Sequence, residues 1–157
     1  GVMEAAIRTV YEVLEKKPLE NLNIEPVRGL EGVKEATLTI AGKEVKVAVA
    51  SGLKNAKEVL EAVKAGEEIH FIEIMGCPGG CINGGGQPIQ PAEVRNFVNM
   101  VERRAKALYT DDAKDVIRKS HENPDIKKLY EEFLGEPGSH KAHEILHTSY
   151  VARPNNY

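Results

Sequence analysis

The feature that most restricts the fold is a glycine-rich segment that carries both cysteines of the chain. Six of the residues from 76 to 86 are glycine, and Cys77 and Cys81 lie among them. Such a stretch loses much backbone entropy when it becomes ordered, so it is usually kept where the main chain must approach a bulky ligand closely. An apolar run at 69–75 precedes it and predicts a short buried strand. The sequence therefore predicts a ligand-binding loop at the end of a strand.

The loop does not match the common phosphate-binding patterns, because it lacks both the Gly-Lys-Ser/Thr ending of a P-loop and the Gly-x-Gly-x-x-Gly spacing of a dinucleotide turn. Thiols surrounded by glycine amides, which can donate hydrogen bonds to sulfide and thiolate, instead suit an iron–sulfur cluster. The Cys-x-x-x-Cys spacing can present two thiolates to one cubane edge. It is also compatible with two buried, inert cysteines or with a disulfide inside the loop.

The number of cysteines leaves the ligand set open. A cubane cluster needs four protein ligands, usually all cysteine, and this chain has two cysteines. Either histidines complete the site, or the remaining ligands lie outside this chain, or no cluster binds.

The rest of the sequence predicts an α/β fold, in which a mixed β-sheet covered by helices is followed by a helical C-terminal tail. Ala41-Gly42 predicts a hairpin turn between the first two strands, and Gly66 predicts the end of a helix. The periodicity predicts helices at 2–16, 54–65 and 91–108, strands at 33–40, 44–50 and 69–75, and shorter helical pieces near 111–119, 124–134 and 140–147.

Charge and hydropathy exclude two classes of partner. The net charge is −3 and acidic and basic residues are interspersed, which offers no basic face for nucleic acid. No apolar run approaches the ~18 residues of a membrane-spanning helix. We expect a cytoplasmic protein. Because the chain opens at Gly1 inside a helical pattern, we also expect an N-terminal region to be missing.

Three stretches resemble one family. Residues 73–88, Glu-Ile-Met-Gly-Cys-Pro-Gly-Gly-Cys-Ile-Asn-Gly-Gly-Gly-Gln-Pro, resemble the third signature motif of iron-only ([FeFe]) hydrogenases. Residues 1–8, Gly-Val-Met-Glu-Ala-Ala-Ile-Arg, resemble the helix start that precedes this motif in the family. The tail resembles the family's small-subunit segment in Arg118-Lys-Ser-His-Glu-Asn-Pro124, Leu129-Tyr130, Phe133-Leu134 and Leu146-His-Thr-Ser-Tyr150.

The resemblance covers the whole chain and implies a domain organisation. Residues 1–110 would form the C-terminal lobe of the H-cluster domain of the large subunit. Residues 111–157 would form a small-subunit-like helical tail, and the N-terminal part of the H-cluster domain would be missing.

The resemblance also implies the cofactor. In such enzymes the H-cluster is a [4Fe-4S] cubane joined through one cysteine sulfur to a diiron unit with CO, cyanide and a bridging dithiolate. By motif position, Cys77 is a terminal ligand of the cubane, Cys81 bridges it to the diiron unit, and Met75 packs near that unit. The glycines expected around the cofactor are Gly76, Gly79, Gly80, Gly84, Gly85 and Gly86. Gly76 stands where the family more often has Ala or Ser, which we expect to tune the site.

The implied activity is the reversible reduction of protons to dihydrogen, with electrons delivered by iron–sulfur relays in an anaerobe's hydrogen metabolism. The expected partners are the upstream part of the same enzyme, with the other two cluster cysteines, and a ferredoxin or other redox subunit. This chain alone is expected to be inactive. The alternatives are a hydrogenase-like factor of iron–sulfur assembly and a sensory hydrogenase-like module; residues 146–150 favour the enzyme.

Other polar residues are open to two interpretations. His140, His143 and His147 lie on one helix face and could bind zinc or the cubane, but we favour hydrogen bonds to backbone or water. Glu73 shares a strand face with Met75 and could relay protons. We favour a role in which its carboxylate accepts hydrogen bonds from the amides of the glycine loop.

Two further histidines are assigned structural roles. His70 lies in the predicted strand, where we expect a histidine with its hydrogen bonds satisfied in the core or at the strand edge. His121 precedes Asn-Pro and is expected at the start of a helix.

Overall fold

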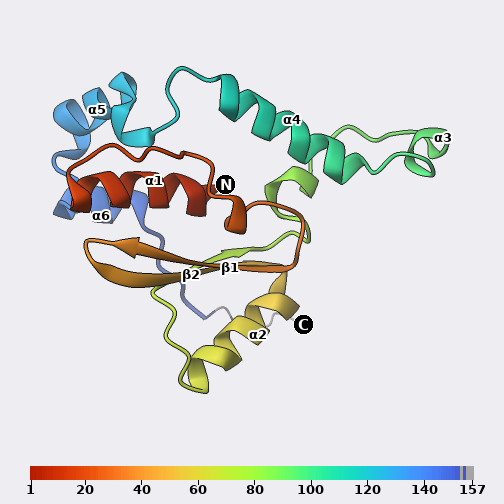
Figure 1. The fold of residues 1–157 in the computed structure, drawn as a ribbon, viewed down its shortest axis with the longest axis horizontal. Coiled ribbons are helices and arrows are strands. Elements are labelled where there is room, and N and C mark those ends of the chain that lie inside the picture. The colour runs from red at the N-terminus through yellow and green to blue at the C-terminus, as the bar shows by residue number, and fades with distance from the viewer. Residues whose placement is uncertain (153, 155–157) are drawn as a thin grey trace. The chain divides into compact units, whose positions relative to one another are not determined.

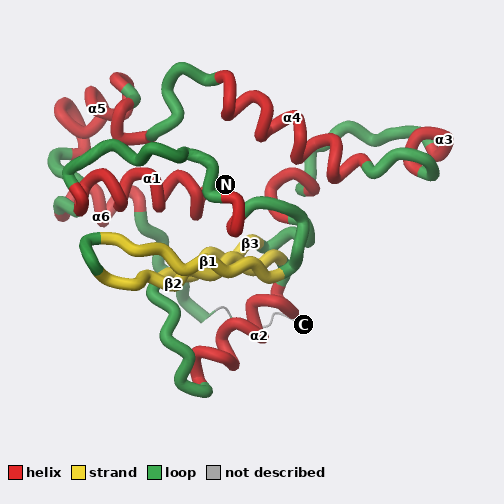
Figure 2. Tube along the Cα trace, viewed as in Figure 1, coloured by secondary structure: helices red, strands yellow, loops and turns green. Residues whose placement is uncertain are grey.

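The computed structural model describes residues 1–152 and 154. It divides into two compact units, Gly1–Arg118 and Lys119–Tyr157, which are described separately. Both contain helices, and the first also contains a three-stranded mixed sheet, so the predicted α/β class is confirmed (Figure 2).

The sheet is built around a central strand. Strand β2 (Lys43–Ser51) pairs antiparallel with β1 (Val33–Ile40) on one side and parallel with β3 (Phe71–Met75) on the other. The β1–β2 hairpin turns at Ala41 and Gly42, which have φ angles of 52° and 73°. Two successive positive φ values match the right-handed twist of the strands, so the predicted hairpin is confirmed.

Helices cover both faces of the sheet (Figure 1). Helix α1 (Val2–Glu15) packs Met3 and Ile7 against Val47 and Val49 of β2. On the opposite face, α2 (Leu53–Lys64) packs Ala56 and Val59 against Ala48 and Ala50. Because successive strand residues point to opposite faces, the part of β2 that is covered on both sides, residues 47–50, is apolar without alternation.

Strand β3 differs from its prediction as a buried strand. Phe71 and Ile74 are 47% and 46% exposed. In the part of the chain that the structure describes, β3 pairs only with β2 and forms an edge of the sheet. The apolar pattern therefore identified the strand correctly and its burial incorrectly.

The single long helix predicted at 91–108 is wrong. The structure has a short helix α3 (Ala92–Arg95) and a second helix α4 (Met100–Lys114), which runs into the segment predicted as a separate piece at 111–119. Asn99 accounts for the break, because its side chain accepts a hydrogen bond from the backbone N–H of Glu102 and begins the new helix.

The second unit is helical, as predicted. It contains a 3₁₀ turn (Ser120–Glu122), helix α5 (Pro124–Leu129) that continues as a π-helical turn (Tyr130–Leu134), and helix α6 (His140–Leu146). The side chains of Asn123 and Ser139 accept backbone hydrogen bonds at the starts of α5 and α6. No helix among the described residues is long and apolar enough to cross a membrane.

Candidate functional site

The cysteine loop leaves the carboxyl end of β3. Met75 is the last residue of that strand, and its carbonyl accepts a hydrogen bond from the N–H of Gly52 at 2.7 Å. A 3₁₀ turn, η2 (Gly80–Asn83), then carries Cys81. Cys77 and Cys81 are both free and exposed. This geometry excludes the two alternatives of a disulfide and of buried, inert thiols.

Two glycines of this loop are required by its backbone. Gly79 and Gly80 have φ angles of 79° and 74°, a backbone conformation that residues other than glycine rarely adopt. A Cβ on Gly80 would also lie 3.0 Å from the Met75 sulfur. The turn that presents Cys81 therefore depends on glycine at position 80 through its backbone conformation, and a side chain there would also press against Met75.

The three successive glycines at 84–86 differ from one another in conformation and surroundings. Of Gly84, Gly85 and Gly86, Gly86 has a positive φ, at 88°. A Cβ on Gly84 would meet the Cys77 sulfur at an ordinary 3.8 Å, whereas Gly76 and Gly85 face open space.

A cavity of about 430 Å³ lies behind the loop, within the first unit. Met75, Gly79, Gly80 and Cys81 line it together with residues of α1 and α4. Of the predicted site residues, the cavity thus brings these four together. Cys77 and the glycines at 76 and 84–86 are not among its lining residues.

Two charged side chains of the sheet also line this cavity. Glu73 accepts a hydrogen bond from the backbone N–H of Met3 at 3.0 Å, at the start of α1. Our preferred interpretation of Glu73, as an acceptor for the amides of the glycine loop, does not match this contact. Lys34 is buried and donates to the carbonyl of Gly29 at 3.2 Å. Burial lowers the pKa of Lys34, and the negative charges of Glu73 and Glu31 oppose that effect.

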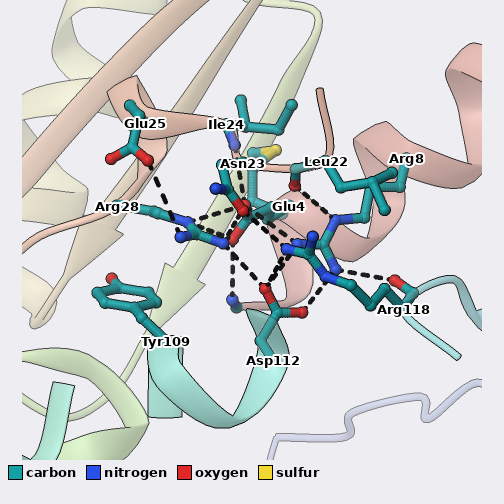
Figure 3. A network of polar contacts seen from close by, with 12 residues as sticks. Glu4, Arg8, Leu22, Asn23, Ile24, Glu25, Arg28, Tyr109, Asp112 and Arg118 are labelled. Atoms are coloured by element: carbon teal, nitrogen blue, oxygen red, sulfur yellow. Dashed lines mark hydrogen bonds and ion pairs between the residues drawn. The ribbon is translucent and has the colours of Figure 1, made fainter. Parts of the chain in front are cut away.

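A buried ionic network borders the same cavity and was not predicted (Figure 3). Glu4 and Arg8 of α1 are 4% and 5% exposed. Asp112 of α4 accepts from Arg8, Arg28 and Arg118 at 2.7–3.0 Å, and Glu4 accepts from Arg28 at 2.9 Å. The hydrogen bond from Arg8 is the main cause that holds the pKa of Asp112 well below its usual range. Only the Glu4–Arg8 spacing of four residues, which places both on one helix face, was a signal in the sequence.

Of the histidines, His70 and His121 lie where the structural interpretation expected them. His70 accepts a hydrogen bond from the N–H of Lys46 through Nδ1 at 3.1 Å, as expected for a strand-edge histidine. His121 lies in the 3₁₀ turn before α5. The rings of His143 and His147 are 4.6 Å apart, but within the described residues no metal-type cluster forms from His140, His143 and His147.

Comparisons with known proteins agree over nearly the full chain. Residues 1–85 match the family "Iron only hydrogenase large subunit, C-terminal domain", and residues 98–153 match "Iron hydrogenase small subunit". The chain is 48% identical over 153 residues to the NADP-reducing hydrogenase subunit HndD of Solidesulfovibrio fructosivorans, covering 98% of this chain and 26% of the relative. It is 31% identical over 155 residues to the cytosolic iron-sulfur assembly component 3 of Rattus norvegicus, covering 97% of this chain and 31% of that protein.

Among solved structures, a variant of the [FeFe]-hydrogenase HydA1 from Chlamydomonas reinhardtii matches with a TM-score of 0.74 and 40% identity. The match covers 97% of this chain and 44% of that structure. The chain thus spans about a quarter to a third of the curated relatives described above and less than half of this enzyme. The chain belongs to the iron-only hydrogenase family.

Proposed function

We propose that this chain forms one wall of the H-cluster site in an iron-only hydrogenase that reversibly reduces protons to dihydrogen. The observation that carries the proposal is the pair of free, exposed thiols on a glycine turn beside a cavity lined by charged side chains. Glycine-rich loops with thiolates suit iron–sulfur clusters. Membership of the hydrogenase family supports the interpretation of this loop as part of the H-cluster site.

The donor set fits half of a cubane. Cys77 is proposed as a terminal ligand, Cys81 as the sulfur shared with the diiron unit, and Met75 as an apolar neighbour of that unit. When bound, the H-cluster, with its CO, cyanide and dithiolate ligands, supplies the redox-active iron at which protons and electrons combine. The turn's left-handed glycines place no side chains beside Cys81, which leaves room for a bulky group there.

The remaining ligands and the electron supply must come from elsewhere. We propose that an upstream part of the same enzyme contributes the other two cysteines, and that a ferredoxin or another redox subunit delivers electrons. The large-subunit family matches residues 1–85 and the small-subunit family residues 98–153, which supports a large-subunit lobe followed by a small-subunit-like tail. The proposed division at about residue 110 lies inside the second match. Free thiols also fit a reducing compartment such as the cytoplasm.

A second candidate is an iron–sulfur assembly factor. It is favoured by one finding, the likeness over 97% of this chain to an assembly component of rat. Such a protein would bind the cubane without the diiron unit. The hydrogenase proposal is preferred because identity to the hydrogenase subunit is higher, at 48% against 31%.

The test uses the complete protein that contains this chain, with cluster content followed by EPR and bound CO and cyanide by infrared spectroscopy. Cys77→Ser should lose the cubane signal, and Cys81→Ser should lose the infrared bands of the diiron unit. Glu61→Gln, at an exposed position of α2, is the control and should keep both. Cubane signal without infrared bands or hydrogen evolution in the unsubstituted protein would favour the assembly factor. An unchanged cubane in Cys77→Ser would refute the ligand assignment.

A further inference from the structure

We infer that Glu73 is a positioning residue of the cysteine loop, and that its carboxylate, balanced by Lys34, sets the reduction potential of the group bound at Cys81. This inference rests on the proposed function and concerns residues that the hydrogenase resemblance did not assign. It is carried by a chain of contacts from α1 to the cysteine turn.

The first contact joins the sheet to α1. The Glu73 carboxylate accepts the backbone N–H of Met3, in the first turn of α1, at 3.0 Å. Met3 is 1% exposed, so losing this acceptor would leave a buried donor unsatisfied. Glu73 therefore fixes β3 against the start of α1, two residues before the strand ends.

The next contacts connect the position of β3 to the position of Cys81. Met75 ends β3, and its carbonyl is held by Gly52 at 2.7 Å. The Met75 sulfur fits so closely against Gly80 that a Cβ there would lie 3.0 Å away. Cys81 follows Gly80 directly. A shift of β3 along α1 would thus displace Met75 and, through Gly80, the thiol of Cys81.

Lys34 supplies the balancing charge. Lys34 pairs with Val49, and Val49 pairs with Glu73, in one row across the three strands. Residues paired in register share a sheet face, so the two charged side chains flank Val49, which is 1% exposed. Both line the cavity that Cys81 also lines. A fixed charge beside a buried residue acts on a neighbouring redox group more strongly than it would in bulk water.

The signs of the expected effects are opposite for the two residues. Reduction adds negative charge, so a nearby carboxylate opposes it and a nearby ammonium favours it. Glu73→Gln keeps an oxygen that can accept the Met3 N–H but removes the charge, so the midpoint potential should rise. Lys34→Met should lower it. A purely structural role would not move the potential in opposite directions.

The positioning part is tested in the apo form of the complete protein, by hydrogen exchange. Glu73→Ala removes the acceptor and should speed exchange of the loop amides at 76–83 roughly tenfold, whereas Glu73→Gln should not. The matched control is Glu15, at the other end of α1, whose carboxylate accepts the N–H of Ala41 at 2.6 Å. Glu15→Ala should leave loop exchange unchanged, and Glu15→Gln should leave the potential unchanged.

Each outcome decides the inference separately from the proposed function. Unchanged loop exchange in Glu73→Ala, or an equal change in Glu15→Ala, would overturn the positioning role. Potentials that do not move in opposite directions in Glu73→Gln and Lys34→Met would overturn the electrostatic role. If the complete protein binds no cluster, the proposed function fails and the electrostatic role fails with it, while the exchange result still decides the positioning role.

Discussion

Arg8 and Asp112 form a two-pronged ion pair across 104 residues of sequence, with Nη1–Oδ1 at 2.9 Å and Nη2–Oδ2 at 3.0 Å. The pair joins α1 to α4, and both helices line the cavity. Arg28 and Arg118 donate to the same carboxylate. The part of the cavity lining that comes from α1 and α4 is therefore held together by a shared carboxylate.

Asp112→Asn should destabilise the first unit by roughly 3 kcal/mol, because it leaves three guanidinium groups without their shared carboxylate. Urea unfolding of the protein measures this change. Asp111→Asn, at the neighbouring exposed position of α4, is the control and should change stability by less than about 0.5 kcal/mol. Equal effects of the two substitutions would contradict the role of the network.

The ion pairs of the Asp112 carboxylate should make the folded protein less stable in acid. The folded pKa of Asp112 is depressed, chiefly by the hydrogen bond from Arg8, so the unfolded chain binds a proton first as the pH falls. Its contribution is complete above the unfolded pKa of about 3.9 and is lost as the pH falls from there through the folded pKa. Urea unfolding at several pH values should show a shallower acid dependence in Asp112→Asn. If stability fell equally steeply with decreasing pH in both proteins, Asp112 would not be the source of the acid dependence.

Alanine substitutions in the glycine loop should differ by position. Gly80→Ala combines a positive φ with a close approach to Met75, so it should cost about 1–2 kcal/mol or more and lower cluster content. Gly86→Ala should also be strained, because its φ is 88°. Gly85→Ala should be neutral or slightly stabilising. Thermal unfolding of the apo form and iron content measure these effects; equal results at positions 80 and 85 would contradict the argument.

The hairpin turn offers a stabilising change. Ala41 has a φ of 52°, which costs an alanine about 1 kcal/mol, whereas asparagine tolerates this conformation and is favoured before glycine in such turns. Ala41→Asn should therefore raise the unfolding free energy by up to about 1 kcal/mol. Ala41→Val is the opposing control, since a β-branched residue is least tolerant of positive φ. A stability gain in both variants would refute the explanation.

This chain on its own should not evolve hydrogen. It contains two cysteines, half of the ligands of a cubane. Assays with reduced methyl viologen and a synthetic diiron complex should give no hydrogen with this chain and hydrogen with the complete protein. Turnover by the chain alone would contradict the proposed need for upstream ligands.

The sequence by itself determined the parts that local chemistry specifies. Alternating apolar residues predicted β1 and β2, Ala41-Gly42 predicted their turn, and the glycine–cysteine loop predicted both the family and the region of the site. These features depend on backbone sterics and on side-chain period, which neighbouring residues carry. The break at Asn99 was also local, but a strong helical period outweighed the capping signal of a single residue in our prediction.

Only the tertiary structure decided which distant residues meet. No pattern near Glu73 indicates that its carboxylate accepts the N–H of Met3, 70 residues away. The pairing of Asp112 with arginines from three segments was equally invisible, and so was the exposure of Phe71. Burial and long-range polar contacts depend on which elements pack together, because the folded chain, rather than the local sequence, determines where a charged group loses its water and what replaces it.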